Sequence, residues 1–202
     1  MVSIKIYVEG AGGRGQPDLT KRCRQAFHKF FEKAGFKGRM PTVIPCGGRQ
    51  TTYEDFCTAL KNASKNELPM LLIDSENAVN QSLWEHLKSN DGWKRPPQAQ
   101  DNQAHLMVQV MESWFLADRP TLARHFGQGF RETKLPNQPK IEEIPKQQVF
   151  DSLKSATRDS RAGAYDKGKH SFDVLGKIDP VKVRSASPFV ERLLIALDNT
   201  NE

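Results

Sequence analysis

The sequence predicts an α/β fold with a mostly parallel sheet of about four strands, flanked by helices and followed by a helical C-terminal region. Short apolar runs rich in β-branched residues alternate with segments whose apolar residues recur at helical spacing. This alternation of strand and helix favours parallel strands joined by right-handed crossovers. With 202 residues, of which 37% are hydrophobic and 27% charged, the chain suits one domain with a real core and a very polar surface.

The first half of the chain supplies three of the expected strands. Residues 4–8 form the first strand, and glycine-rich punctuation separates it from an amphipathic helix over residues 19–34. A second strand over residues 41–46 ends at two glycines, after which Thr51 or Thr52 would cap a second helix. Residues 70–73 are the third strand, so this half predicts a complete β-α-β-α-β unit.

The next segment supplies a fourth strand and then turns helical. A short helix is expected over residues 82–87, and a polar, proline-containing loop over residues 91–103. The fourth strand covers residues 105–110, and residues 112–118 leave it as a helical turn. Pro120 then opens a helix that runs through Phe126, which completes an α/β core over residues 1–126.

The last part of the chain is expected to be a connection followed by helices. Residues 127–145 show no clear period and form a long connection. Three helices follow, over about residues 146–157, 167–176 and 188–198, and the last of them is the most apolar. Residues 127–202 should therefore pack on the core, giving a single compact domain.

Bulk features exclude several classes of protein. No apolar run approaches the roughly 18 residues that span a bilayer, and the N-terminus lacks the pattern of a signal peptide. The three cysteines, Cys23, Cys46 and Cys57, have no CxxC spacing, which argues against a disulfide framework and against structural zinc. We therefore expect a cytoplasmic protein with no membrane partner.

Positive charge is concentrated near the N-terminus. Residues 10–41 contain eight Lys and Arg against two acidic residues, which accounts for the whole net charge of +6. A basic stretch beside an acidic site suits a polyanionic substrate, because Lys and Arg bind phosphate groups. A solvated helix face explains the same stretch equally well.

Two short acidic motifs follow expected strands and carry most of the functional information. Glu9 comes directly after the first strand, and Asp74 and Glu76 come after the third. The carboxyl ends of parallel strands are where ligands bind in open α/β sheets. Converging carboxylates repel one another unless a cation lies between them, and a hard divalent cation such as Mg²⁺ or Mn²⁺ points to phosphate chemistry. A surface carboxylate at Glu9 and ordinary turn chemistry at Asp74 are the alternative explanations.

Further side chains are candidates for the same site. Glu112 lies just beyond the fourth strand and is a candidate fourth metal ligand, although it is also placed to cap a helix. Candidate contacts to phosphate or nucleic acid come from basic residues in the first turn, after the second strand and in a late basic patch: Arg14, Arg49, Lys167 and Lys169. An exposed helix start explains the late basic patch equally well.

A formal GxGxxG motif over residues 10–15 offers a different function. It follows a strand and precedes a helix, as a dinucleotide fingerprint does. However, Glu9 would place negative charge beside the pyrophosphate, and Cys46 stands where an acidic residue would bind the ribose. A flexible turn that lets Gly10 pass close to a bound ion explains the glycines better.

Several motifs together resemble the TOPRIM fold of topoisomerases, primases and OLD-type nucleases, and more closely an uncharacterised bacterial TOPRIM-like family. That family carries VEG, PCGGR, DSE, MExWFLAD, a Y-x-K-x-x-H region and a helix that begins with SP. Here these motifs lie at residues 8–10, 45–49, 74–76, 111–118, 165–170 and 187–188. The match covers nearly the whole chain.

The resemblance implies a Mg²⁺-dependent nuclease in which Glu9, Asp74 and Glu76 are catalytic and metal-binding residues. It also implies an ABC-type or SMC-like ATPase partner encoded nearby, as in anti-phage defence modules. Assembly into a homo-oligomer is compatible with the sequence. The chain has no P-loop of its own, so an ATP-driven step would require such a partner. The alternative is a non-catalytic sensor or binding subunit of an ATPase complex.

Overall fold

Four parallel strands form the single sheet of this protein, in a computed structural model that describes residues 2–11 and 17–199. The strands are β1 (Ser3–Val8), β2 (Thr42–Pro45), β3 (Glu67–Asp74) and β4 (Ala104–Met107), and their spatial order is β2-β1-β3-β4. Val8 lies in register with Pro45 on one side and with Leu72 on the other. The predicted α/β class with a parallel sheet is confirmed.

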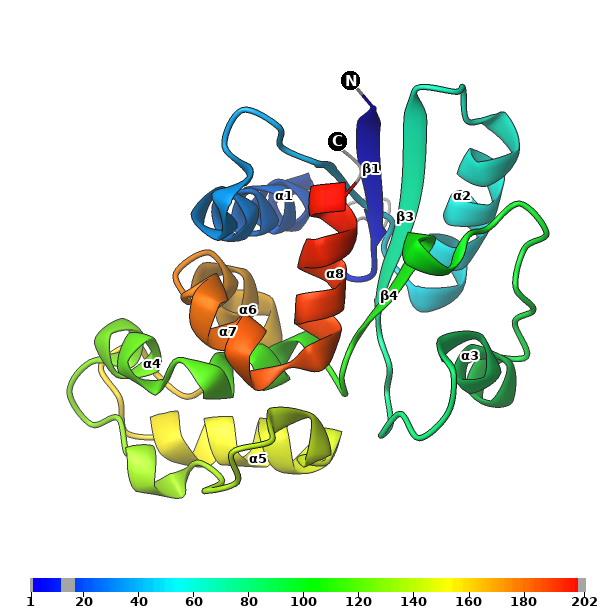
Figure 1. The fold of residues 1–202 in the computed structure, drawn as a ribbon. Coiled ribbons are helices and arrows are strands. Elements are labelled where there is room, and N and C mark those ends of the chain that lie inside the picture. Colours follow the sequence, from blue (N-terminus) through cyan, green and yellow to red (C-terminus); the bar gives the residue numbers. More distant parts are fainter. Residues whose placement is uncertain (1, 12–16, 200–202) are drawn as a thin grey trace.

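Helices cover both faces of the sheet, as Figure 1 shows. One face is covered by α2 (Arg49–Asn62) and α3 (Leu83–Asp91), and the other by α1 (Pro17–Phe31) and α8 (Pro188–Asn199). The helices that follow β4 lie beside and below α1 in this view, and α6 (Lys167–Leu175) packs directly against α1. The C-terminal region is therefore helical, as predicted, and two of its helices contact the rest of the fold, α6 at α1 and α8 at β4.

The remaining elements are short helices and turns. They are a π-helical extension of α1 (Glu32–Phe36), the 3₁₀ turns η2 (Asp101–Gln103), η3 (Met111–Ala117), η4 (Glu132–Lys134) and η5 (Ile141–Glu143), and the helices α4 (Arg119–Phe126), α5 (Lys146–Thr157) and α7 (Pro180–Ala186). Helix α7 was not predicted from the sequence. It begins at Pro180, and the side chain of the preceding Asp179 accepts a hydrogen bond from the amide of Val181.

The prediction that Thr51 or Thr52 caps the second helix is wrong. The residue preceding α2 is Gly48, and both threonines lie inside the helix. The hydroxyl of Thr52 donates a hydrogen bond to the carbonyl of Gly48, at 2.9 Å, so it binds back along the first turn instead of capping it.

The period of two along the strands divides the core between the two faces of the sheet. Ile6, Val8 and Leu72 pack with the aromatic residues of α1, and Leu71 and Ile73 pack with Phe56 of α2 on the opposite face. Asp74 has the same parity as Leu72, so its side chain lies on the α1 and α6 side of the sheet. This parity decides which helix meets the Asp74 carboxylate.

The sheet has a topological switch between β1 and β3. The chain leaves β1 toward β2 through α1 and crosses back past β1 to β3 through α2, and these helices lie on opposite faces (Figure 1). Crevices at the carboxyl ends of such strand pairs are the ligand sites of open α/β sheets. The acidic motifs after β1 and β3 flank this crevice.

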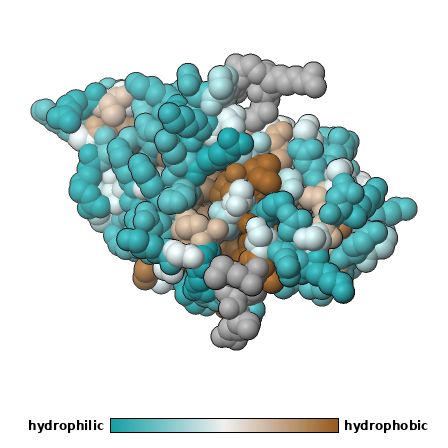
Figure 2. All heavy atoms as spheres, turned by 90° about the horizontal axis from the view of Figure 1, so that it is seen from above, coloured by the Kyte–Doolittle hydropathy of each residue, from teal (hydrophilic) through white to brown (hydrophobic). Residues whose placement is uncertain are grey.

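The opposite end of the molecule looks different. Figure 2 views the protein from the amino ends of the strands, where the surface is largely hydrophilic with apolar residues gathered in a strip near the middle. Among the described residues, no helix combines the length and the apolar character that crossing a membrane requires.

Candidate active site at the carboxyl ends of the strands

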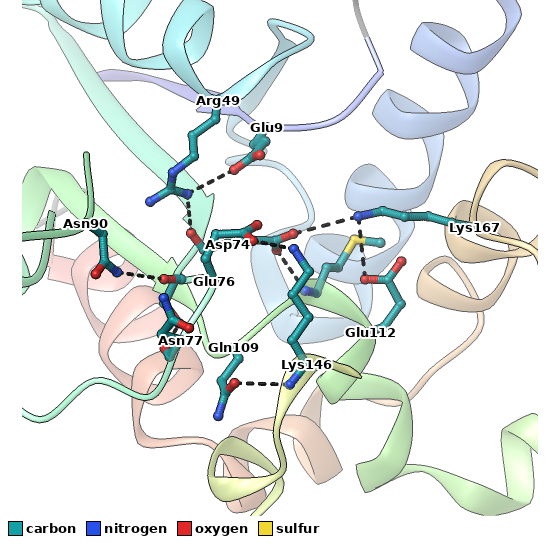
Figure 3. A network of polar contacts seen from close by, with 12 residues as sticks. Glu9, Arg49, Asp74, Glu76, Asn77, Asn90, Gln109, Glu112, Lys146 and Lys167 are labelled. Atoms are coloured by element: carbon teal, nitrogen blue, oxygen red, sulfur yellow. Dashed lines mark hydrogen bonds and ion pairs between the residues drawn. The ribbon is translucent and has the colours of Figure 1, made fainter. Parts of the chain in front are cut away.

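Carboxylates from three adjacent strands meet in one region, shown in Figure 3. Glu9 follows the last residue of β1, Asp74 is the last residue of β3, and Glu112 lies in the turn η3 that follows β4. The sheet order places β1, β3 and β4 side by side, so three segments far apart in sequence deliver their acidic residues to one edge.

Of the two carboxylates at the switch point between β1 and β3, Glu9 and Asp74, the carboxylate of Asp74 is the more deeply buried. It is 5% exposed, and its Oδ1 accepts a hydrogen bond from the amide of Met111 at 2.8 Å. Its Oδ2 lies 3.9 Å from the Nζ atom of Lys167 on α6. Burial, and next the adjacent Glu112 carboxylate, raise the pKa of Asp74 well above its ordinary value, against the opposing effect of Lys167.

Glu112 is fully buried, and its two oxygens have different surroundings. Oε1 accepts a hydrogen bond from the hydroxyl of Tyr165 at 2.9 Å. Oε2 has no hydrogen-bond partner among the described residues, and the nearest cation is the Nζ atom of Lys167 at 4.0 Å. Lys167 therefore stands between two carboxylates, at ion-pair distance from both and hydrogen-bonded to neither.

Glu9 is held from the opposite side by Arg49. Its Oε2 accepts a hydrogen bond from Nη1 of Arg49 at 3.2 Å. Burial nevertheless raises the pKa of Glu9, because Arg49 offsets only part of the desolvation and Glu76 adds to the rise. Arg49 also forms two hydrogen bonds with Asp91, at 2.7 and 2.8 Å, and donates to the carbonyl of Asp74.

Glu76 lies beyond the end of β3, so the strand period does not set its direction. Its backbone has a φ of 67°, in the left-handed region, and its amide donates to the carbonyl of Gln109 at 2.9 Å. Its carboxylate forms an ion pair with Lys146 at the start of α5. Asp74 and Glu76 therefore face different lysines, although the Glu76 carboxylate contributes to the raised pKa of Glu9.

Two predicted phosphate contacts are placed elsewhere or not described. The Nζ atom of Lys169 donates to the carbonyl of Ala162 at 3.3 Å, away from the carboxylates, and its amide is capped by Asp166. Arg14 lies outside the described residues, as does most of the GxGxxG motif. Gly10 is described, with a φ of +99° and its amide bound to the carbonyl of Gly47 at 2.9 Å.

Two partners of the carboxylates, Lys146 and the hydroxyl of Tyr165, were not predicted from the sequence, and neither was Asp91, which pairs with Arg49. Tyr165 belongs to a motif that was noted, but its link to Glu112 joins residues 53 positions apart. Lys146 and Glu76 are separated by 70 positions. No local pattern in the sequence predicts either contact.

A small pocket opens between the carboxylates and α6. Its volume is about 110 Å³, and its polar lining includes Glu9, Asp74 and Lys167. Within the described parts of the chain, five carboxylates of this network (Glu9, Asp74, Glu76, Asp91 and Glu112) meet three cationic side chains (Arg49, Lys146 and Lys167). With all groups ionised, the network lacks two positive charges.

The donor set fits a hard divalent cation in its chemistry. Asp74 and Glu112 offer carboxylate oxygens, the ligands that Mg²⁺ and Mn²⁺ prefer, and the buried Oε2 of Glu112 lacks a hydrogen bond. In the described side-chain arrangement, however, no three His, Cys, Asp or Glu residues converge closely enough to hold a metal ion. Binding would require the ammonium of Lys167 to move from between Asp74 and Glu112, with Glu9 turning toward them.

Comparison with known proteins gives one finding. A family model described as "Domain of unknown function (DUF4276)" matches residues 13–198. No curated protein and no solved structure matches the chain.

Proposed function

The chain belongs to the family described as a domain of unknown function (DUF4276), and from its site we propose that it is a Mg²⁺-dependent nuclease that hydrolyses phosphodiester bonds in DNA or RNA. The observation that carries this proposal is the charge deficit at the switch point. Three carboxylates, which follow β1, end β3 and lie in the turn after β4, outnumber the two cations that face them, Arg49 and Lys167. They lie beside a pocket large enough for a few water-sized groups.

Asp74 and Glu112 would hold the metal ion, and Glu9 would complete its ligands or act as a general base. Bound Mg²⁺ supplies Lewis-acid stabilisation of the phosphate oxygens and lowers the pKa of a coordinated water. The raised pKa of Glu9 brings its proton affinity closer to what a general base needs near neutral pH. The Glu76 carboxylate adds negative potential to the same region.

Lys167 and Arg49 have separate tasks in this proposal. Lys167 reaches the pocket from α6 with its ammonium 3.9 Å from Asp74, so a small movement would let it pair with a phosphate oxygen. The guanidinium of Arg49 is already bound to Asp91, Glu9 and a backbone carbonyl. We therefore assign Arg49 to positioning Glu9.

The biological setting follows from the resemblance to TOPRIM-like proteins. We propose that the nuclease acts in the cytoplasm as the effector of an anti-phage system, with an ABC-type or SMC-like ATPase as its partner. The described cysteines are free thiols, which suits a reducing compartment.

The test is metal-dependent cleavage of plasmid, single-stranded DNA and tRNA with Mg²⁺ or Mn²⁺. Wild type is compared with Glu9→Gln and Asp74→Asn, and with Glu54→Gln, which removes a carboxylate charge on the exposed side of α2. We expect both site variants to lose at least a hundredfold in rate and the control to keep wild-type activity. Undiminished cleavage by Asp74→Asn would reject the assignment.

One observation favours a second function, a non-catalytic binding subunit of an ATPase complex. Glu9, Asp74 and Glu76 each already face a cation of the protein itself. Calorimetric titration with Mn²⁺ separates the two functions, because the nuclease requires Mn²⁺ binding that is lost in Asp74→Asn. A subunit of the second kind would bind no Mn²⁺ and would co-purify with the ATPase.

A further inference from the structure

A second polar hollow lies on the outer side of α6, away from the carboxylates. It consists of two adjoining depressions of about 100 and 440 Å³, which share Gly176 and Lys177. We call it the α1–α6 groove, and its basic lining consists of Arg22, Lys29, Lys33, Arg124 and Lys177. None of these residues belongs to the proposed active site.

The sequence of α1 explains why the basic side chains lie along one line. Arg22, Lys29 and Lys33 are seven and four positions apart, so they follow one face of α1 and its π-helical extension. The end of α6 lies against this face, and a Cβ atom at Gly176 would be in van der Waals contact with the side chain of Lys29, at 3.4 Å. Lys177 and Arg124 complete the groove from the far side.

Most of this positive charge is not balanced by carboxylates. Arg22 pairs with Asp173 at 3.3 Å, but Lys29, Lys33, Arg124 and Lys177 form no ion pair with a carboxylate in the described part of the chain. The amine of Lys33 donates to the carbonyl of Ile178, and that of Lys177 lies 2.8 Å from Nδ1 of His125. Asp118, the nearby buried acid, is held by Lys182 at 2.7 Å.

The groove and the carboxylate pocket lie at two ends of one helix. Phe172 of α6 lines both hollows, while Lys167 lines the pocket and Lys177, just past the end of α6, lines the groove. Ten residues at about 1.5 Å each separate these lysines by about 15 Å. The rise per phosphate along one strand of stacked, duplex-like DNA is about 3.4 Å, so this distance corresponds to about four stacked nucleotides.

We propose that the α1–α6 groove binds the phosphate backbone of a single nucleic-acid strand and leads it to the carboxylate pocket. This inference rests on the proposed nuclease function and adds its substrate-binding surface. The carboxylate pocket, at about 110 Å³, has room for a phosphate group, and a basic groove that follows the backbone is how proteins bind single strands. Four cations without carboxylate partners supply the charge that a phosphate backbone recognises.

The test measures binding without cleavage. The probe is fluorescein-labelled oligothymidylate of about 20 nucleotides, and anisotropy is recorded in EDTA at several salt concentrations. The variant is Lys29→Gln/Arg124→Gln/Lys177→Gln, which leaves the hydrogen bond of Lys33 intact. We expect at least tenfold weaker binding at low salt and a salt slope reduced by about 2, since each lost phosphate contact on a single strand contributes about 0.7.

The matched control is Lys61→Gln/Lys65→Gln/Lys88→Gln. It removes the same charge from the opposite layer of the molecule, around α2 and α3 (Figure 1). Three outcomes would refute binding by the groove: equal loss of binding in both triple variants, an unchanged salt slope in the groove variant, or no binding by wild type. So would thermal stabilisation by pyrophosphate without oligonucleotide binding, which indicates a small-anion site. The binding measurement does not require cleavage, so its result can be interpreted even if the nuclease assay shows no activity.

Discussion

Tyr165→Phe tests the most unusual contact of the site, the hydrogen bond between two buried residues far apart in sequence. Tyr165 is 3% exposed, Glu112 is 0% exposed, and the O–O distance is 2.9 Å. Burial, and next the adjacent Glu112 carboxylate, raise the pKa of Tyr165, so its hydroxyl remains a donor throughout the working pH range. Deleting the hydroxyl leaves neither oxygen of Glu112 with a hydrogen bond among the described residues.

The expected cost follows from the chemistry of the pair. A hydrogen bond to a charged group contributes about 1.5–3 kcal/mol, and here water cannot replace the lost donor without entering the core. For a chain of this size, a loss of about 2 kcal/mol lowers the melting temperature by roughly 4–8 °C. Urea and thermal unfolding followed by circular dichroism measure both quantities.

Tyr53→Phe is the matched control, because it deletes the same atom from a half-buried tyrosine whose hydroxyl donates to the carbonyl of Lys94 at 2.6 Å. Solvent reaches this carbonyl, so we expect a loss of about 0.5 kcal/mol. If Tyr165→Phe unfolds at the wild-type urea midpoint, or if both variants lose equally, Glu112 is not held in the way described.

Three further predictions concern the charges and the backbone. Lys167→Met should destabilise the metal-free protein by about 1–2 kcal/mol at neutral pH, because it leaves the buried carboxylates of Asp74 and Glu112 unpaired. Acidification should reduce this loss of stability, and urea unfolding at several pH values measures it. Asp74→Asn should stabilise the metal-free protein at neutral pH. Because the pKa of Asp74 is raised in the folded state, the contribution of Asp74 to stability is fully present below the unfolded-state pKa and is lost as the pH rises through the folded-state pKa. The uncharged Asn side chain avoids this loss. A stability–pH curve of the same shape in wild type and variant would contradict this reasoning. Gly129→Ala should lower the free energy of unfolding by at least about 3 kcal/mol, because φ is +86° and a Cβ atom would overlap the carbonyl oxygen of Asp159. The control Gly38→Ala, with a φ of +87° and open space around it, should lower it by only about 1–2 kcal/mol. Comparable melting temperatures for the two variants would show that the structure relieves the clash at little cost.

The fold class was predictable because strand and helix periods alternate clearly over the first half of the chain. The third strand is an apolar run that ends at Asp74, and the structure places β3 there with Asp74 as its last residue. The helix predicted over residues 146–157 matches α5. By contrast, α7 has seven residues, which is too short for a helical period to stand out against its flanking turns.

The site was only partly predictable, for a physical reason. Parity along a strand places Asp74, but it ends with the strand, so it does not determine where Glu76 points once the backbone enters the left-handed region. The partners of the carboxylates lie on helices whose packing depends on contacts between distant segments, as with Lys146 and Glu76. Sequence spacing carries no information about such contacts.

The order in which the chain is made has a consequence for this site. All five carboxylates of the network are synthesised by residue 112, whereas Lys146 and Lys167 emerge later. On the ribosome, the nascent sheet therefore carries a cluster of negative charge that Arg49 balances only in part until α5 and α6 dock. A fragment that stops at residue 126 would lack Lys146, Tyr165 and Lys167 and should be obtained as aggregated or unfolded protein.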